Sequence, residues 1–187
     1  MIKFLRPGRS KRLGKLTLLT VGLCTATLCL AQGHAHEHGV VKLDIAVEAG
    51  KLTVQMESPL DNLVGFERAP RTEAERKTVD AAVARLKAAA TLFKIDPAAG
   101  CSVARVDLAS APLKLGNAEP AAVNDGHADL DGEFEFSCKD SAHVSFIDLG
   151  LFAAFAGMQR IDVQIAAPQG QFKRTLSRPA THIDFAR

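Results

Sequence analysis

VKLDIAVEAGKLTVQM, residues 41–56, is the stretch that decides the fold prediction. Its apolar residues occupy every second position on both sides of Ala49-Gly50. Such alternation places the apolar side chains on one face of a strand, and a small Ala-Gly pair between two alternating runs is typical of a tight turn. The stretch therefore predicts an antiparallel β-hairpin with one buried face, which Pro59 ends.

A helix is predicted next. Thr72 and Glu75 stand three residues apart, the spacing of a capping box at a helix N-terminus. The apolar residues after them fall three or four positions apart: Val79, Val83, Leu86, Ala90 and Phe93. Because Asp96-Pro97 cannot continue a helix, we expect one amphipathic helix from about Thr72 to Phe93, with one face on a sheet.

The remaining segments complete the fold prediction. Alternating or β-rich runs cover residues 101–108, 129–138, 160–166 and 171–176, with a Pro168-Gln-Gly170 turn between the last two. Residues 149–155 predict a short apolar helix or turn, and residues 109–126 have the composition of a surface linker. The predicted class is α+β, with antiparallel hairpins forming a sheet and one main amphipathic helix packed on a face.

Residues 1–31 have the layout of a cleaved secretory signal. Cations precede an uncharged apolar run from Leu16 to Leu30, and small residues follow. This run is shorter than the roughly twenty residues that a membrane span needs, so we expect a soluble, exported mature chain without membrane insertion. The expected organisation is a signal over 1–31, a flexible histidine-rich start over 32–38, and a single domain over 39–187. Two intimately packed halves joined by the 109–126 linker are the alternative for this last part.

Charge excludes one class of function. The signal contains six of the 23 Lys and Arg residues and none of the 21 Asp and Glu residues, so the mature chain is mildly acidic. It also lacks Tyr, Trp and any cationic run. These features argue against nucleic acid as a partner.

Two cysteines follow the signal, Cys101 and Cys138. An isolated pair in an oxidising compartment predicts a disulfide, which would stabilise the fold by about 4 kcal/mol in the chain-entropy model. Two thiolate ligands to a metal are the alternative.

His34, His36 and His38 form a cluster in the sequence HAHEHG. Their two-residue spacing places all three imidazoles on one side of an extended chain. Imidazole nitrogen binds zinc, copper and nickel well, so the cluster predicts a metal-binding N-terminus. The alternative interpretation is a solvated polar tail.

The cleavage point adds a second possibility for metal binding. Cleavage after Ala31, Gly33 or Ala35 would in each case place a histidine third in the mature chain. A free amino terminus, two amides and that imidazole form the square-planar site that Cu(II) and Ni(II) prefer. Copper or nickel therefore stays open beside zinc.

A second candidate site lies around Asp129. The side chains of one strand face share odd numbers: His127, Asp129, Asp131, Glu133 and Glu135. Like charges along a strand need cross-strand cations or a bound ion. One interpretation is a solvated face beside Lys173 or Arg160, and the other is a metal site with His127 as nitrogen donor.

The chain has no sequence signature of catalysis. His143 and His182 are isolated and are interpreted as structural histidines. No nucleophile motif, phosphate loop or HExxH motif occurs. A binding protein is therefore favoured over an enzyme.

Three stretches resemble the ZrgA-like family of zinc-regulated periplasmic proteins, with similarity over essentially the whole mature chain: HEHGVVKLDIAVEAGKLTVQMESPLDNLVGFERAPRT, GHADLDGEFEFSC and QRIDVQIAAPQGQ. SPLDNLVGFE and HADLDGEFEFSC are the most specific parts. The resemblance implies a periplasmic zinc-binding accessory protein of Gram-negative bacteria that works beside a zinc-uptake ABC transporter, without catalytic activity. It implies zinc ligands at His34, His36, His38 and His127.

The chain departs from the family in two places. Members often carry a His/Asp-rich insertion before the HADLD stretch, but residues 114–126 contain no histidine, so the metal load should be smaller. Members also tend to have histidine after GFE, where this chain has Arg68. Within LDNLVGFE, we expect Asp61 and Asn62 to form a turn and Glu67 to form a surface pair with Arg68, with a metal or partner contact as the alternative.

These observations predict an exported, monomeric protein that binds Zn(II) reversibly through His34, His36 and His38, joined by His127 and Asp129. Its task would be to buffer zinc or deliver it to the transporter. Because histidine binds metal only when neutral, affinity should fall below roughly pH 6.5. A metal-independent periplasmic interaction or structural module, and copper or nickel handling, are the alternatives.

Overall fold

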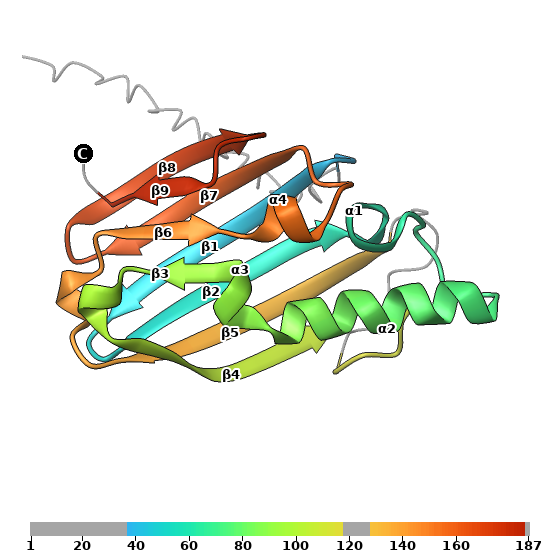
Figure 1. Ribbon diagram of the computed structural model, residues 1–187, viewed down its shortest axis with the longest axis horizontal. Coiled ribbons are helices and arrows are strands. Elements are labelled where there is room, and N and C mark those ends of the chain that lie inside the picture. Colours follow the sequence, from blue (N-terminus) through green and yellow to red (C-terminus); the bar gives the residue numbers. More distant parts are fainter. Residues whose placement is uncertain (1–36, 118–127, 186–187) are drawn as a thin grey trace, which may run out of the picture. The chain divides into compact units, whose positions relative to one another are not determined.

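The computed structural model describes residues 37–117 and 128–185. Within them, two sheets lie face to face, with strand orders β4-β5-β2-β1-β7-β8 and β3-β6-β9 (Figure 1). The strands are β1 (Val40–Glu48), β2 (Lys51–Pro59), β3 (Phe93–Ile95), β4 (Cys101–Ala109), β5 (Asp129–Cys138), β6 (Phe146–Leu149), β7 (Arg160–Ala167), β8 (Gly170–Ser177) and β9 (His182–Asp184). The helices are α1 (Leu60–Val64), α2 (Glu73–Lys87), α3 (Ala89–Leu92) and α4 (Leu151–Ala154), with 3-10 turns at Pro97–Ala99 and Ser141–His143. The predicted α+β class is confirmed.

Several sequence predictions concern residues outside this description. They are the signal over 1–31, the histidines His34, His36 and His127, and the last part of the 109–126 linker. The described start of that linker forms a turn closed by a bridge between Ser110 and Leu115.

Both predicted hairpins are present. β1 and β2 pair antiparallel around Gly50, whose positive φ of 74° suits glycine at this turn. β7 and β8 form the second hairpin. The two hairpins join through a parallel pairing of β1 with β7, in which Leu43 lies opposite Val163. Alternation alone did not predict this parallel contact, because it fixes the face of a strand and not its neighbour.

The main helix is shorter than predicted. α2 begins after Thr72 with the expected capping box, but it ends at Lys87, where Ala88 leaves the helical conformation (ψ 47°). The predicted end at Phe93 is wrong because Phe93 begins β3 and pairs with Leu149. In this position the Phe93 ring packs 4.8 Å from that of Phe134, so tertiary packing outweighs the local helical pattern.

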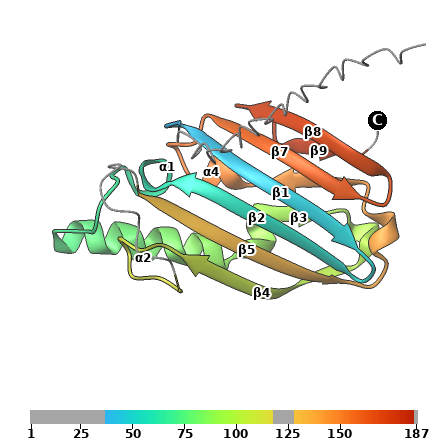
Figure 2. The ribbon, with the colours of Figure 1, turned by 180° about the vertical axis from the view of Figure 1, so that it is seen from behind.

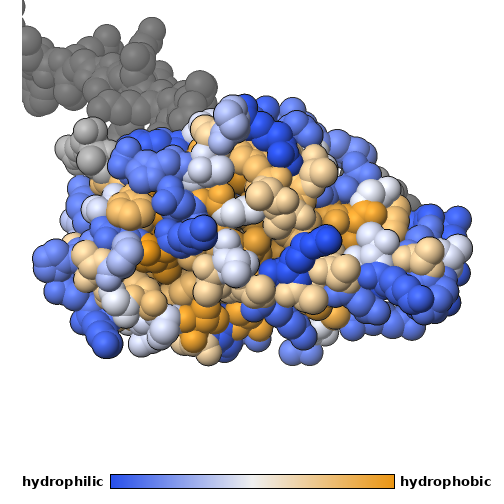
Figure 3. All heavy atoms as spheres, in the orientation of Figure 1, coloured by the Kyte–Doolittle hydropathy of each residue, from blue (hydrophilic) through white to orange (hydrophobic). Residues whose placement is uncertain are grey.

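The hydrophobic core fills the space between the two sheets. The inward residues of β1, β2 and β5 are buried, as their alternation predicts. The opposite face of the six-stranded sheet is covered by no other described element (Figure 2). On the other side of the molecule, the surface over α2 is mostly hydrophilic (Figure 3).

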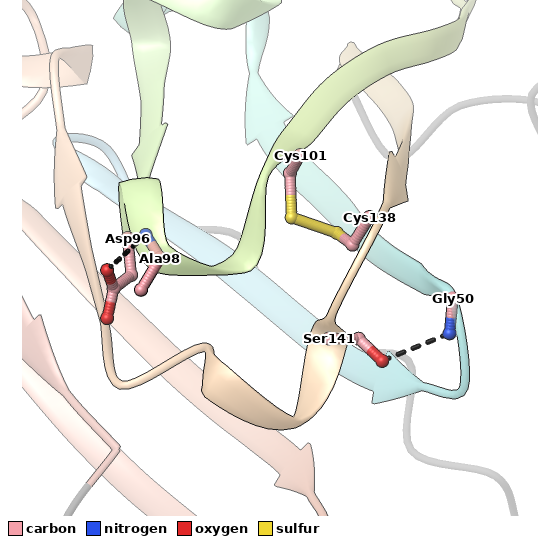
Figure 4. Close-up of a disulfide and its surroundings, with 6 residues drawn as sticks. All are labelled: Gly50, Asp96, Ala98, Cys101, Cys138 and Ser141. Atoms are coloured by element: carbon pink, nitrogen blue, oxygen red, sulfur yellow. Dashed lines mark hydrogen bonds between the residues drawn. A yellow bond between two sulfur atoms is a disulfide. The ribbon is translucent and has the colours of Figure 1, made fainter.

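Cys101 and Cys138 lie opposite each other on β4 and β5 and form the predicted disulfide. The alternative of two thiolate metal ligands is therefore wrong. Figure 4 shows the loops beside this bond. The Ser141 hydroxyl accepts a hydrogen bond from the Gly50 N–H (3.0 Å), and the Asp96 carboxylate accepts one from Ala98 N–H (2.9 Å). A hydrogen bond from the Ser145 hydroxyl is the main cause that lowers the pKa of Asp96.

Candidate metal site

One end of the six-stranded sheet brings together the chain segments that carry the candidate ligands. β1 begins at this end just after His38, β2 ends there, and β5 begins there with Asp129 opposite Pro59. The Leu60 N–H donates to the Ala128 carbonyl oxygen at 2.8 Å and ties this end together. Since β2 lies between β1 and β5, the two entry points are separated by two strand spacings, about 10 Å.

His38 lies between two carboxylates at this end. Its Nε2 is 3.1 Å from Glu67 Oε1, and its Nδ1 is 3.5 Å from Asp61 Oδ2. The imidazole is 59% exposed, whereas the Glu67 side chain is only 15% exposed. The last histidine of the cluster thus contacts acidic groups of the folded body, where the sequence had offered a metal or partner contact only as the alternative. The only sequence signal for this contact was that both carboxylates lie in LDNLVGFE, part of one of the most specific stretches of the resemblance.

Asn62 fixes the backbone next to His38. Its Oδ1 accepts a hydrogen bond from the Gly39 N–H (2.7 Å), and its Nδ2 donates one to the Val40 carbonyl (2.8 Å). Asn62 is 2% exposed and lies in the short helix α1, so the expected turn at Asp61 and Asn62 is wrong. The helix presents Asn62 to the start of β1 and Asp61 to His38.

Glu37, next to His38 in the chain, is bound by an arginine of β7. Arg160 on β7 donates to its carboxylate at 2.8 Å and also contacts Asp162. The hydrogen bond to Glu37 is the main reason that the pKa of Arg160 is raised. Glu37 and His38, the first two described residues of the chain, are therefore both attached to the folded body.

Arg68, at the position where the resemblance implies a histidine, helps to begin α2. Its guanidinium donates to both carboxylate oxygens of Glu75, at 2.6 and 3.0 Å, and lies over the Phe66 ring. Glu75 also accepts the backbone N–H groups of Arg71 and Thr72. The bond from Arg68 and then that from Arg71 lower the pKa of Glu75 to about 2. This arginine stabilises the helix cap and offers no metal ligand.

A basic side chain lies beside the acidic face of β5, but it comes from a different strand than predicted. Asp131, Glu133 and Glu135 point away from the core, as their alternation predicts. Arg105 on the neighbouring β4 pairs with Glu133 and lies 3.7 Å from Glu135. The prediction that Lys173 or Arg160 lies beside this face is wrong, because β2 and β1 separate β5 from β7 and β8. A cross-strand cation accounts for these acidic residues without a bound metal ion.

In the described residues, no three His, Cys, Asp or Glu side chains are grouped so that they could hold a metal ion by themselves. Asp129 is at the start of β5, while its expected partner His127 lies outside the description. Any complete site therefore needs donors beyond the described ranges, and His38 is the one candidate histidine whose surroundings are described.

The other two described histidines bind carboxylates of their own. His143 Nδ1 lies 2.7 Å from Asp140. His182 lies between Asp148 (2.6 Å from Nδ1) and Asp184 (3.1 Å from Nε2), and it stacks on Phe146. The contact with Asp148 is the main cause that raises the pKa of His182.

Replacing His182 by glutamine should destabilise the protein more at pH 5.5 than at pH 8.5. The raised pKa means that the folded state binds the proton more tightly than the unfolded state. The stabilisation is thus complete below the unfolded value of about 6.5 and is lost as pH rises through the folded value. We expect a difference of about 0.5 kcal/mol, typical of an exposed ion pair, in urea unfolding at the two pH values. Equal destabilisation at the two pH values would contradict this prediction.

The fold and this site define a two-sheet α+β protein in which a histidine from an N-terminal cluster contacts two carboxylates of the folded body. A sequence model described as "ZrgA family zinc uptake protein" matches residues 35–185. The chain therefore belongs to the ZrgA family, as its sequence stretches had indicated. A search of curated proteins found no match. Across the described ranges, every helix is too short or too polar to cross a membrane.

Proposed function

We propose that this protein is a periplasmic zinc-binding accessory protein that buffers Zn(II) or delivers it to a zinc-uptake ABC transporter. Its zinc ligands would be His34, His36 and His38, joined by His127 and Asp129. The family description supports a role in zinc uptake. The cleaved signal over 1–31 would direct the monomeric protein to the periplasm, and a disulfide suits that oxidising compartment.

The contact of His38 with the folded body is the observation that carries this proposal. A free tail would bind zinc with histidines alone and would lose much conformational freedom on binding. Here Glu37 and His38 are already attached to the body, by Arg160 and by Glu67. The segment that leads into β5 enters the sheet at the same end. This arrangement supports the proposal that ligands from both segments bind one ion.

Deleting residues 32–38 from the mature protein should abolish tight Zn(II) binding without unfolding the domain. Isothermal titration calorimetry of metal-stripped protein measures this, with micromolar or tighter binding expected for the undeleted chain. Protons compete with zinc for imidazole nitrogen, so the same titration at pH 5.5 should give much weaker binding than at pH 7.5. A variant with both His143 and His182 replaced by asparagine is the matched control and should bind normally.

Other outcomes would assign a different role. Binding that survives the deletion would move the site to the body near Asp129. Binding of Cu(II) or Ni(II) that is lost on acetylation of the amino terminus would indicate a square-planar terminal site. No binding by the undeleted protein would favour a metal-independent interaction module.

A further inference from the structure

We propose that Glu67 is a direct zinc ligand and that Asp61 orients His38 for the same ion. This inference rests on the proposed function and extends it, because it assigns carboxylate ligands of the folded body to the histidine site. Neither residue was named among the zinc ligands predicted from the sequence, which offered a metal contact in LDNLVGFE only as an alternative.

The two ring nitrogens of His38 cannot bind the same ion, so their two carboxylates have different roles. Two ligands of a tetrahedral zinc ion, each about 2.0–2.2 Å from it, are separated by about 3.3–3.6 Å. The distance from His38 Nε2 to Glu67 Oε1 is 3.1 Å, close to that separation. A zinc ion could therefore be bound by these two atoms with little movement of either side chain.

Asp61 occupies the position of an orienting carboxylate. Metal-binding histidines commonly donate their second ring N–H to a carboxylate, which fixes the ring and raises its basicity. Asp61 Oδ2 lies 3.5 Å from Nδ1, on the ring nitrogen that Glu67 does not contact. The Asp61–His38–Glu67 arrangement thus assigns Nε2 to the metal.

Burial and backbone geometry make Glu67 a prepared ligand. Asp61 lies on α1, whose Leu60 and Leu63 are in the core. The helix ends at Gly65 in the left-handed conformation (φ 83°), which favours glycine and turns the chain back toward His38. Because the Glu67 side chain is only 15% exposed, it has less rotational freedom to lose on binding zinc than a surface glutamate.

The donor count agrees with this assignment. His38 and Glu67 supply two of the four donors of a zinc site, and the third described group, Asp61, does not face the ion. The remaining donors would come from the other histidines of the proposed site.

A second histidine of the chain provides an internal control. His182 also has carboxylates near both nitrogens, with Asp184 3.1 Å from Nε2, but Asp184 is 69% exposed and no histidine cluster precedes it. Glu67→Gln and Asp184→Asn remove equivalent charges from histidine–carboxylate pairs of the same distance. Only the first should change zinc binding.

The test compares the mature protein with E67Q, E67D, D61N and D184N by Zn(II) calorimetry and by the visible spectrum of bound Co(II). We expect E67Q to weaken zinc binding at least tenfold and to change the Co(II) spectrum, which reports the ligand set. E67D should recover part of the affinity, and D61N should weaken binding with little spectral change. D184N should match the parent protein, and thermal melting in EDTA should show that each variant is folded.

Unchanged affinity and spectrum in E67Q would overturn the inference. Weaker binding with an unchanged Co(II) spectrum would also overturn it, because Glu67 would then act through its charge alone. In both cases the proposed function stands if the 32–38 deletion still abolishes binding. If the undeleted protein binds no zinc, the proposed function fails first, and the assignment of Glu67 fails with it.

Discussion

Replacing Cys101 and Cys138 by serine should lower the free energy of unfolding by about 4 kcal/mol. The bond joins residues 37 positions apart, and the chain-entropy model gives this value for a loop of that length. The loss should be concentrated on β4, an edge strand whose residues Ser102–Arg105 are exposed, so that few packing contacts replace the bond. Urea unfolding of the double variant at neutral pH measures the change.

Reduction of the parent protein is the matched control for this prediction. Dithiothreitol should lower its stability toward that of the double serine variant, while the variant itself should not respond. A change below about 1 kcal/mol would show that packing of β4 and β5 holds the strands together without the covalent bond.

Replacing Asn62 by alanine should cost about 3 kcal/mol of stability. The substitution removes the partners of the Gly39 N–H and the Val40 carbonyl. Leaving a buried donor or acceptor unsatisfied costs about 1–3 kcal/mol for each group. The backbone at Asn62 has little room to shift, because Gly157 packs closely against it. A Cβ added to Gly157 would lie only 2.6 Å from the Asn62 carbonyl oxygen.

Asn117→Ala is the matched control for Asn62, because Asn117 is exposed and its replacement should change stability by less than about 0.5 kcal/mol. Thermal and urea unfolding of both variants provide the comparison. Equal stability of the two variants would mean that water satisfies the start of β1 as well as Asn62 does.

Features encoded locally were predictable from the sequence. The two hairpins, the capping box at Thr72, the disulfide and the outward side of β5 all follow from neighbouring residues or from a simple pairing rule. Resemblance supplied the family, which the sequence model then confirmed.

Features that depend on tertiary contacts were not predictable. The early end of α2 depends on Phe93 packing against Phe134, and the cation of the acidic face depends on the neighbour of β5. Asn62 looked like a turn residue because asparagine is usually exposed, and nothing local indicated that it satisfies Gly39. The contact of His38 with Glu67 joins residues separated by a hairpin and a helix, so no spacing rule could find it.

The parallel pairing of β1 with β7 has a consequence for the order in which the strands can pair. Val41 pairs with Ile161, which follows about 120 residues later in the chain. β1 therefore lacks its second neighbour until the last third of the chain is present, and such distant pairing is slow to form. A fragment ending in the 109–126 linker would expose one whole edge of β1 as an open template for unwanted strand pairing.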